Sequence, residues 1–184
     1  DACYCAGCRR RFESELGRAV SGWPEAVRRG PLAVRYREWR RGQITRLVVM
    51  AREAVRAHRP AAKLSAAVFT TPATCRESVG QDWPEWLRQG LVDFVCPMDY
   101  ATNLTTFAEM VRGQMQLLGA PGRLFPGIGV TAREGGLDAV QTMDQIRVAR
   151  EAGAAGVMLF DLNLTLGHDI LPYLRLGLTA DGIR

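Results

Sequence analysis

The chain has 184 residues, a formal net charge of +5 and an apolar fraction of 47%. These values are typical of one globular domain. No apolar run reaches 18 residues, which excludes a membrane span of the usual kind. Residues 1–20 lack the apolar segment of a signal peptide. The first residue is Asp1 rather than Met, which indicates a processed, trimmed or fragmentary chain and leaves the localisation open.

The positive charge comes almost entirely from arginine. Lys63 is the single lysine, so 23 of the 24 basic residues are arginines, scattered beside Glu and Asp in segments with helical periodicity. Arginine can hold anions with its planar fork, but this scatter is more typical of a solvated outer face. No basic stripe with interleaved aromatic residues is present, so we expect no nucleic-acid partner.

Three of the five cysteines crowd into the opening "CYCAGC" as Cys3, Cys5 and Cys8, and the others are Cys75 and Cys96. A structural zinc site needs four ligands, so the fourth would be Cys75, a histidine or a residue upstream. A disulfide within the trio and plain loop thiols are the alternatives, and an odd cysteine count argues against a full disulfide framework. We assign no metal or cofactor from the sequence.

The predicted elements alternate along the chain. Apolar spacing predicts a long helix over 32–58, stopped by Pro60. Short apolar runs predict buried strands, and amphipathic segments between them predict helices. In chain order these are a strand at 61–69, a helix at 84–90, a strand at 91–98, a helix at 106–119, a strand at 123–130, a helix at 137–153, a strand at 155–162 and a helix at 168–178.

The four strands start about 30 residues apart, which is the length of one βα unit. Such units give parallel strands, either in a doubly wound open sheet or in a (β/α)8 barrel. No glycine-rich dinucleotide or P-loop motif follows any strand, and polar and aromatic residues stand at the strand ends instead. We therefore predict an α/β fold of the (β/α)8 TIM-barrel type. A full barrel needs about 250 residues, so the chain is expected to be one partial barrel domain over 1–184.

Candidate site residues follow from the strand ends, because barrel active sites form there. Asp99 and Tyr100 end the strand at 91–98. Asp99 is a candidate acid/base or substrate contact, or else it caps the next loop. Tyr100 is a candidate hydrogen-bonding or stacking residue for a sugar, or else a rim residue. Asp161 ends the strand at 155–162 and is a weaker candidate, against a loop-capping role.

The loop after the first strand holds a second group of candidates: Gln81, Asp82 and Trp83. Amide and carboxylate groups bind sugar hydroxyls, and an aromatic ring can cover a sugar face. The alternative is that Asp82 favours the dipole of the helix that follows, while Trp83 only packs. We expect Trp86 to be a core residue.

The order "CYCAGCRRRFESELG", "YREWRRGQITRLV", "KLSAAVF", "QDWPEWLRQGLVDFVCPMDY" and "FPGIGV" resembles the bacterial glycosyl hydrolase-like 10 domain family. The resemblance covers nearly the whole chain and implies a (β/α)8 glycoside hydrolase without a cofactor. It places the four strands as strands five to eight. It implies a catalytic role for Asp99, beside which Tyr100, Gln81, Asp82, Trp83 and Asp161 are the candidate substrate contacts.

The family's strand-four motif, rich in Asp, His and Tyr, is absent from this sequence. Glycoside hydrolysis uses two carboxyl groups, so the resemblance implies that the partner of Asp99 lies upstream of Asp1. The resemblance suggests a bacterial source and a secreted or cell-envelope location. The sequence does not specify the sugar, the linkage, the stereochemical course or the oligomeric state.

Two other functions stay open. One is a barrel that binds carbohydrate without cutting it. The other is a barrel that handles phosphate or a sugar phosphate, because barrels often bind phosphate after strands seven and eight, where "TAREGG" (131–136) and "DLNLTLG" (161–167) stand.

Overall fold

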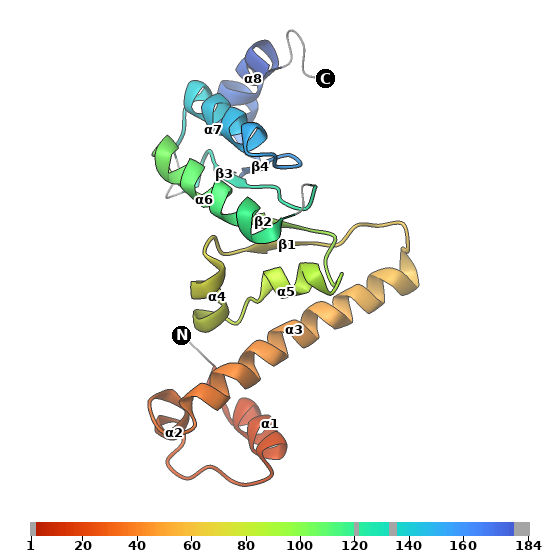
Figure 1. Cartoon of the computed structure of the whole chain (residues 1–184), viewed down its shortest axis with the longest axis vertical. Helices are drawn as coiled ribbons and strands as arrows, with labels where there is room; N and C mark the ends of the chain where they lie inside the picture. Colours follow the sequence, from red (N-terminus) through yellow and green to blue (C-terminus); the bar gives the residue numbers. More distant parts are fainter. Residues whose placement is uncertain (1–2, 120–121, 133–135, 179–184) are drawn as a thin grey trace. The chain divides into compact units, whose positions relative to one another are not determined.

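The computed structural model describes residues 3–119, 122–132 and 136–178, and the chain divides into two compact units (Figure 1). Unit 1 comprises Asp1–Ala62 and Pro72–Trp86. Unit 2 comprises Lys63–Thr71 and Leu87–Arg184.

Unit 1 is helical in the part of it that the structure describes. Its elements are α1 (Ala6–Leu16), α2 (Glu25–Arg28), α3 (Ala33–His58), α4 (Pro72–Ser78) and the first residues of α5 (Trp83–Arg88). Its core is a set of aromatic rings. Phe12 of α1 lies edge-on to Tyr36 of α3 at a centroid distance of 5.0 Å, and Tyr36 stacks on Trp39 at 5.2 Å. These large rings let a small unit bury apolar area with few residues.

Unit 2 holds four short parallel strands: β1 (Ser65–Val68), β2 (Phe94–Pro97), β3 (Gly127–Gly129) and β4 (Met158–Phe160). β1 pairs with β2 and β3 pairs with β4. A parallel bridge between Val95 and Leu124 joins the two pairs. The neighbours in space are therefore also neighbours in sequence.

Helices α6 (Leu104–Leu118) and α7 (Ala139–Glu151) follow β2 and β3. Asn103 caps α6 by accepting a hydrogen bond from the Thr106 N–H, and Gly119 ends it in the left-handed region at φ 59°. After β4, a π-helical turn η1 (Leu166–Ile170) leads into α8 (Leu171–Leu178). Helices α6, α7 and α8 pack in succession, since α6 contacts α7 and α7 contacts α8.

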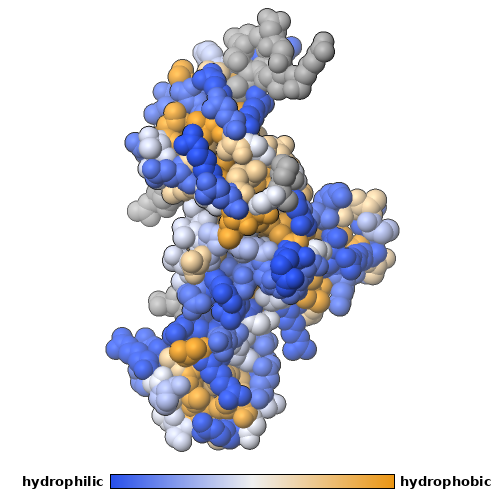
Figure 2. Space-filling model, viewed as in Figure 1, coloured by the Kyte–Doolittle hydropathy of each residue, from blue (hydrophilic) through white to orange (hydrophobic). Residues whose placement is uncertain are grey.

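The strands of unit 2 have one buried face and one open face. Val68, Val95, Leu124 and Ile128 have no exposed surface. The strand register places Ala67, Phe94, Gly127, Gly129, Met158 and Phe160 on the opposite face. Met158 and Phe160 are 45% and 47% exposed there. In Figure 2, hydrophobic residues are visible on the surface around these strands.

The structure confirms a mixed α/β chain with short parallel sheets. Each predicted strand is present but is trimmed to three or four residues. The helix predicted over 32–58 is confirmed as α3, and the one at 168–178 begins earlier, as η1. Helices α1, α2 and α4 were not predicted, because their short sequences give no sustained apolar period. That all 184 residues form one partial barrel domain stays a prediction.

In the portion of the chain that the structure describes, no helix combines the length and the apolar character that a membrane crossing requires.

Candidate functional site

Asp99, just beyond the end of β2, is fully buried. The Gln114 side chain of α6 donates a hydrogen bond of 2.7 Å from Nε2 to Asp99 Oδ1. The same Nε2 donates to the Thr70 carbonyl at 3.0 Å. Gln114 therefore joins the ends of β1 and β2 to the helix, and it fixes the Asp99 carboxyl toward α6.

Burial raises the pKa of Asp99 to about 7, and hydrogen bonding to Gln114 and Thr70 only partly opposes this shift. Removal from water disfavours the carboxylate, so a substantial fraction of Asp99 stays protonated near pH 7. Its Oδ2 atom is buried and has no hydrogen-bond partner among the described residues. A protonated carboxyl in this environment has the proton that a general acid needs, but no solvent-exposed surface.

Tyr100 lies on the open face of the strands and is half-buried. Its ring stacks on Phe160 of β4, with centroids 5.4 Å apart and planes 21° apart. A Cβ at Gly129 would come within 2.9 Å of the Tyr100 ring, so glycine at this position of β3 makes room for the aromatic pair. Tyr100 and Phe160 thus form an aromatic surface at the carboxyl ends of the strands.

Asp161 follows β4, after a cis Phe160–Asp161 peptide bond. Its Oδ1 accepts hydrogen bonds from the Thr131 hydroxyl and from Asn163 Nδ2, the latter at 3.0 Å. The Asp161 N–H in turn donates to Thr131 Oγ1 at 3.0 Å. Thr131 and Asn163 were not among the individual candidates from the sequence, because a single Thr or Asn in a loop carries no specific signal. The three side chains form a polar cluster beside Phe160.

The other three predicted residues lie in unit 1, whereas Asp99, Tyr100 and Asp161 lie in unit 2. Asp82 forms ion pairs with Arg76 at 3.0 Å and Arg41 at 3.9 Å. The Gln81 main chain bonds to Cys75 through both its N–H and its carbonyl.

Trp83 is fully buried, so its ring face is covered in this structure. The core position predicted for Trp86 is confirmed: the residue is 3% exposed, and its indole N–H donates to Thr45 Oγ1 at 3.0 Å.

A cavity of about 430 Å³ opens between the loop after β3, the start of α7 and η1. Its described lining includes Thr131, Thr165 and the two acids Asp138 and Asp169. Two carboxylates would repel a phosphate group, so this lining does not favour the phosphate alternative. Within "TAREGG", residues 133–135, Arg133 included, lie outside the described residues.

The Cys3, Cys5 and Cys8 sulfur atoms all lie within 4.8 Å of one another. Hydrogen bonds from the Cys8 N–H and then from the Cys3 side chain lower the pKa of Cys5 to about 7, whereas burial raises the pKa of Cys8 to about 11. Among the described residues, this is the group of cysteine, histidine and acidic side chains close enough to share a metal ion. Cys75 and Cys96 are buried outside it.

The sequence model of the glycosyl hydrolase-like 10 family matches residues 15–117, which is more than half of the chain. The chain belongs to this family. No curated protein matches it. The matched span of this glycosyl hydrolase-like 10 chain includes Asp99, Tyr100 and the Gln81–Trp83 segment, and it ends within α6, before β3 and β4. Cys3, Cys5, Cys8 and Asp161 lie outside the matched residues.

Proposed function

We propose that unit 2 contributes four consecutive strands to a (β/α)8 barrel and that the barrel binds carbohydrate at the carboxyl ends of these strands. The strand order supports the barrel. Parallel strands that neighbour one another in chain order, without a reversal, are typical of a barrel wall, whereas a doubly wound sheet reverses its order at a switch point.

The open face of the strands also supports the barrel. Phe69, Met158 and Phe160 each expose close to half of their surface. In a closed barrel, side chains of the remaining strands would fill the space in front of this face. We therefore propose that the rest of the barrel wall covers this open face, and that unit 2 forms strands five to eight of the barrel.

The observation that carries carbohydrate binding is the stacked pair Tyr100–Phe160 beside the Thr131–Asp161–Asn163 cluster. A sugar ring has an apolar C–H face and polar hydroxyl edges. An aromatic side chain can cover the C–H face, while a carboxylate and an amide can form hydrogen bonds with the hydroxyls. Both kinds of group stand at the same ends of neighbouring strands, where barrels bind their ligands.

Hydrolysis is the second candidate, and the Asp99 pKa of about 7 favours it. A carboxylic acid that keeps its proton at neutral pH can protonate the leaving oxygen of a glycosidic bond. Because Asp99 is buried against α6, this role requires the loop after β2 to expose Oδ2 when substrate binds. The second carboxyl group would come from the strands outside unit 2. Substrate contacts by Gln81, Asp82 and Trp83 stay a prediction from the sequence, because these residues lie in unit 1 and the Trp83 ring is covered.

A glycan panel that includes peptidoglycan fragments tests binding by isothermal titration. We expect Tyr100→Ala to weaken glycan binding about tenfold, the effect of losing roughly 1.4 kcal/mol of stacking. Tyr173→Ala is the matched control, because Tyr173 is an exposed tyrosine of unit 2 on α8. Equal loss in the two variants, or no saturable glycan binding at all, would contradict the proposal.

Hydrolysis is tested by measuring released reducing ends. The assay uses a protein that contains both unit 2 and the other strands of the barrel. If Asp99 is the acid, Asp99→Asn lowers turnover by about 10²-fold or more and leaves glycan affinity unchanged. Binding that needs Tyr100, with no release even in the unmodified protein, identifies a carbohydrate-binding barrel without hydrolysis.

A further inference from the structure

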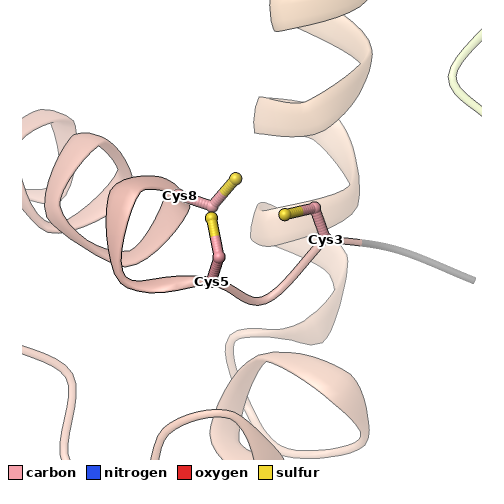
Figure 3. A group of neighbouring side chains, drawn as sticks. All are labelled: Cys3, Cys5 and Cys8. Carbon is pink, nitrogen blue, oxygen red and sulfur yellow. The ribbon is translucent and has the colours of Figure 1, made fainter.

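The three cysteines of "CYCAGC" converge at the beginning of α1. Figure 3 shows their side chains gathered where the chain enters this helix, and their sulfur atoms lie within 4.8 Å of one another. Cys3 and Cys5 are exposed, and Cys8 is buried. All three are free thiols.

The local backbone explains the convergence. Cys5 is the N-cap residue of α1 and has an extended conformation, with φ −66° and ψ 165°. Cys8 lies three residues further on, in the first turn, and side chains with this spacing share one face of a helix. Cys3 precedes the cap by two residues in the incoming chain. The C-x-C-x-x-C spacing therefore delivers three sulfurs to one helix end.

The segment is held by the aromatic core of unit 1. The Tyr36 hydroxyl donates to the Cys3 carbonyl at 2.5 Å, and the Trp23 indole N–H donates to the Tyr4 carbonyl at 2.9 Å. The Tyr4 ring stacks on Tyr36, with centroids 5.6 Å apart. These contacts fix the backbone between Cys3 and Cys5. The sulfurs are thus positioned by groups that are not themselves ligands, as well-formed metal sites require.

We propose that Cys3, Cys5 and Cys8 bind one thiophilic divalent cation of the zinc class. A zinc ion holds thiolate sulfur at about 2.3 Å in tetrahedral geometry, which sets neighbouring sulfurs roughly 3.8 Å apart. Reaching this separation from the observed cluster takes side-chain adjustments of about 1 Å or less. Each thiol releases its proton as it binds the cation.

The excess negative charge of three thiolates and the fourth coordination position of the cation are the remaining requirements of such a site. Three thiolates exceed the charge of a divalent ion by one, and the guanidinium of Arg11 lies 3.5 Å from the Cys8 sulfur, where it can offset the excess. No fourth cysteine, histidine or acid joins the cluster among the described residues. Cys75, the candidate from the sequence, bonds instead to the Pro72 and Gln81 carbonyls. The described residues thus leave the fourth position to a ligand from outside them, such as water or an added thiol.

Binding would close the segment before α1 onto the helix and so secure the Tyr4 ring against Tyr36. A cation that binds only the folded form raises the stability of that form. All four tryptophans belong to unit 1, so their fluorescence reports this unit directly.

The test uses the 184-residue chain, kept reduced with a phosphine. Cobalt(II) is titrated first, because thiolate-to-cobalt charge transfer and intense d–d absorption identify tetrahedral sulfur ligation without any variant. We expect these bands to saturate at one cobalt per chain and to be displaced by one zinc. Zinc should also raise the midpoint of thermal unfolding followed by tryptophan fluorescence.

Cys3→Ser and Cys5→Ser should each weaken the charge-transfer bands and lose the tight zinc equivalent, and both positions are exposed, so the fold tolerates serine there. Cys75→Ser is the control: a serine hydroxyl can donate the bonds that Cys75 makes, and the variant should keep the cation. The proposal is overturned if cobalt shows only the weak octahedral spectrum, or if both serine variants retain zinc. It is equally overturned if the trio forms a disulfide without reductant, seen as a 2 Da mass loss, while the reduced chain takes up no zinc.

Discussion

At the residue scale, the position of Asp99 illustrates how burial sets the chemistry of a side chain. Gln114 supplies the hydrogen bond that a buried carboxyl needs, and loss of solvent raises the pKa of Asp99 to about 7 from its ordinary value of 3.8. The folded chain therefore binds this proton more tightly than the unfolded chain does. Between these two pKa values the folded state holds more protons, so its stability falls as the pH rises.

We expect the free energy of unfolding to decrease by roughly 3 kcal/mol between pH 5 and pH 8 through Asp99, with little further loss above the pKa of about 7. Asp99→Asn removes this titration, so the free energy of unfolding of the variant should change less between pH 5 and pH 8. The measurement is urea unfolding followed by far-ultraviolet circular dichroism at both pH values, in both proteins. Other titrating groups cancel in the comparison. An unchanged pH slope in the variant would mean that Asp99 is already ionised in the folded chain.

At the element scale, α7 shows how a local sequence signal sets the beginning of a helix. Asp138 accepts a hydrogen bond of 2.8 Å from the Gln141 N–H, and the Gln141 side chain accepts one of 3.0 Å from the Asp138 N–H. This reciprocal capping box satisfies two donors that have no partner within the helix. It also fixes where α7 begins beside the cavity after β3.

Asp138→Ala should lower the free energy of unfolding by about 1 kcal/mol, because the first turn of α7 loses its cap. Asp144→Ala is the control, since Asp144 lies on the same helix and forms an exposed ion pair with Arg147, which contributes little. Chemical unfolding at one pH, followed by far-ultraviolet circular dichroism, measures both changes. Equal effects of the two substitutions would show that the cap contributes nothing beyond its charge.

At the scale of the whole molecule, unit 2 exposes large apolar side chains on the open face of its strands. Phe69, Met158 and Phe160 are 49%, 45% and 47% exposed. Large exposed apolar patches on soluble proteins mark surfaces that associate with another surface. Under the proposed barrel, the remaining strands cover this face.

For the 184-residue chain alone, we expect concentration-dependent self-association through the open face. Met158→Lys should weaken it several-fold in sedimentation velocity, because it places a charge in the patch. Leu117→Lys is the control, since Leu117 is 54% exposed on α6, away from the open face. Self-association that the two variants reduce equally, or that neither reduces, would contradict this role of the open face.

The sequence by itself determined the order and type of the regular elements that carry the site. Apolar runs at βα spacing located all four strands, because a buried parallel strand must be apolar along its length. The same pattern placed Asp99, Tyr100 and Asp161 at strand ends. The helical period of residues 32–58 located α3 to within one residue.

Only the tertiary structure decided what each of these side chains faces. Side chains alternate between the two faces of a strand, but beyond its end the turn of the chain sets their direction. Asp99 points to Gln114, fifteen residues later in the chain, while its neighbour Tyr100 meets Phe160 on the open face. In the same way, "CYCAGC" predicts three thiols near one another, but whether they share one site depends on Tyr36 and Trp23, which hold that segment from positions distant in sequence. The burial of a side chain depends on contacts between residues far apart in the sequence, which no local pattern contains. The pKa of Asp99 depends on them too, because burial raises it.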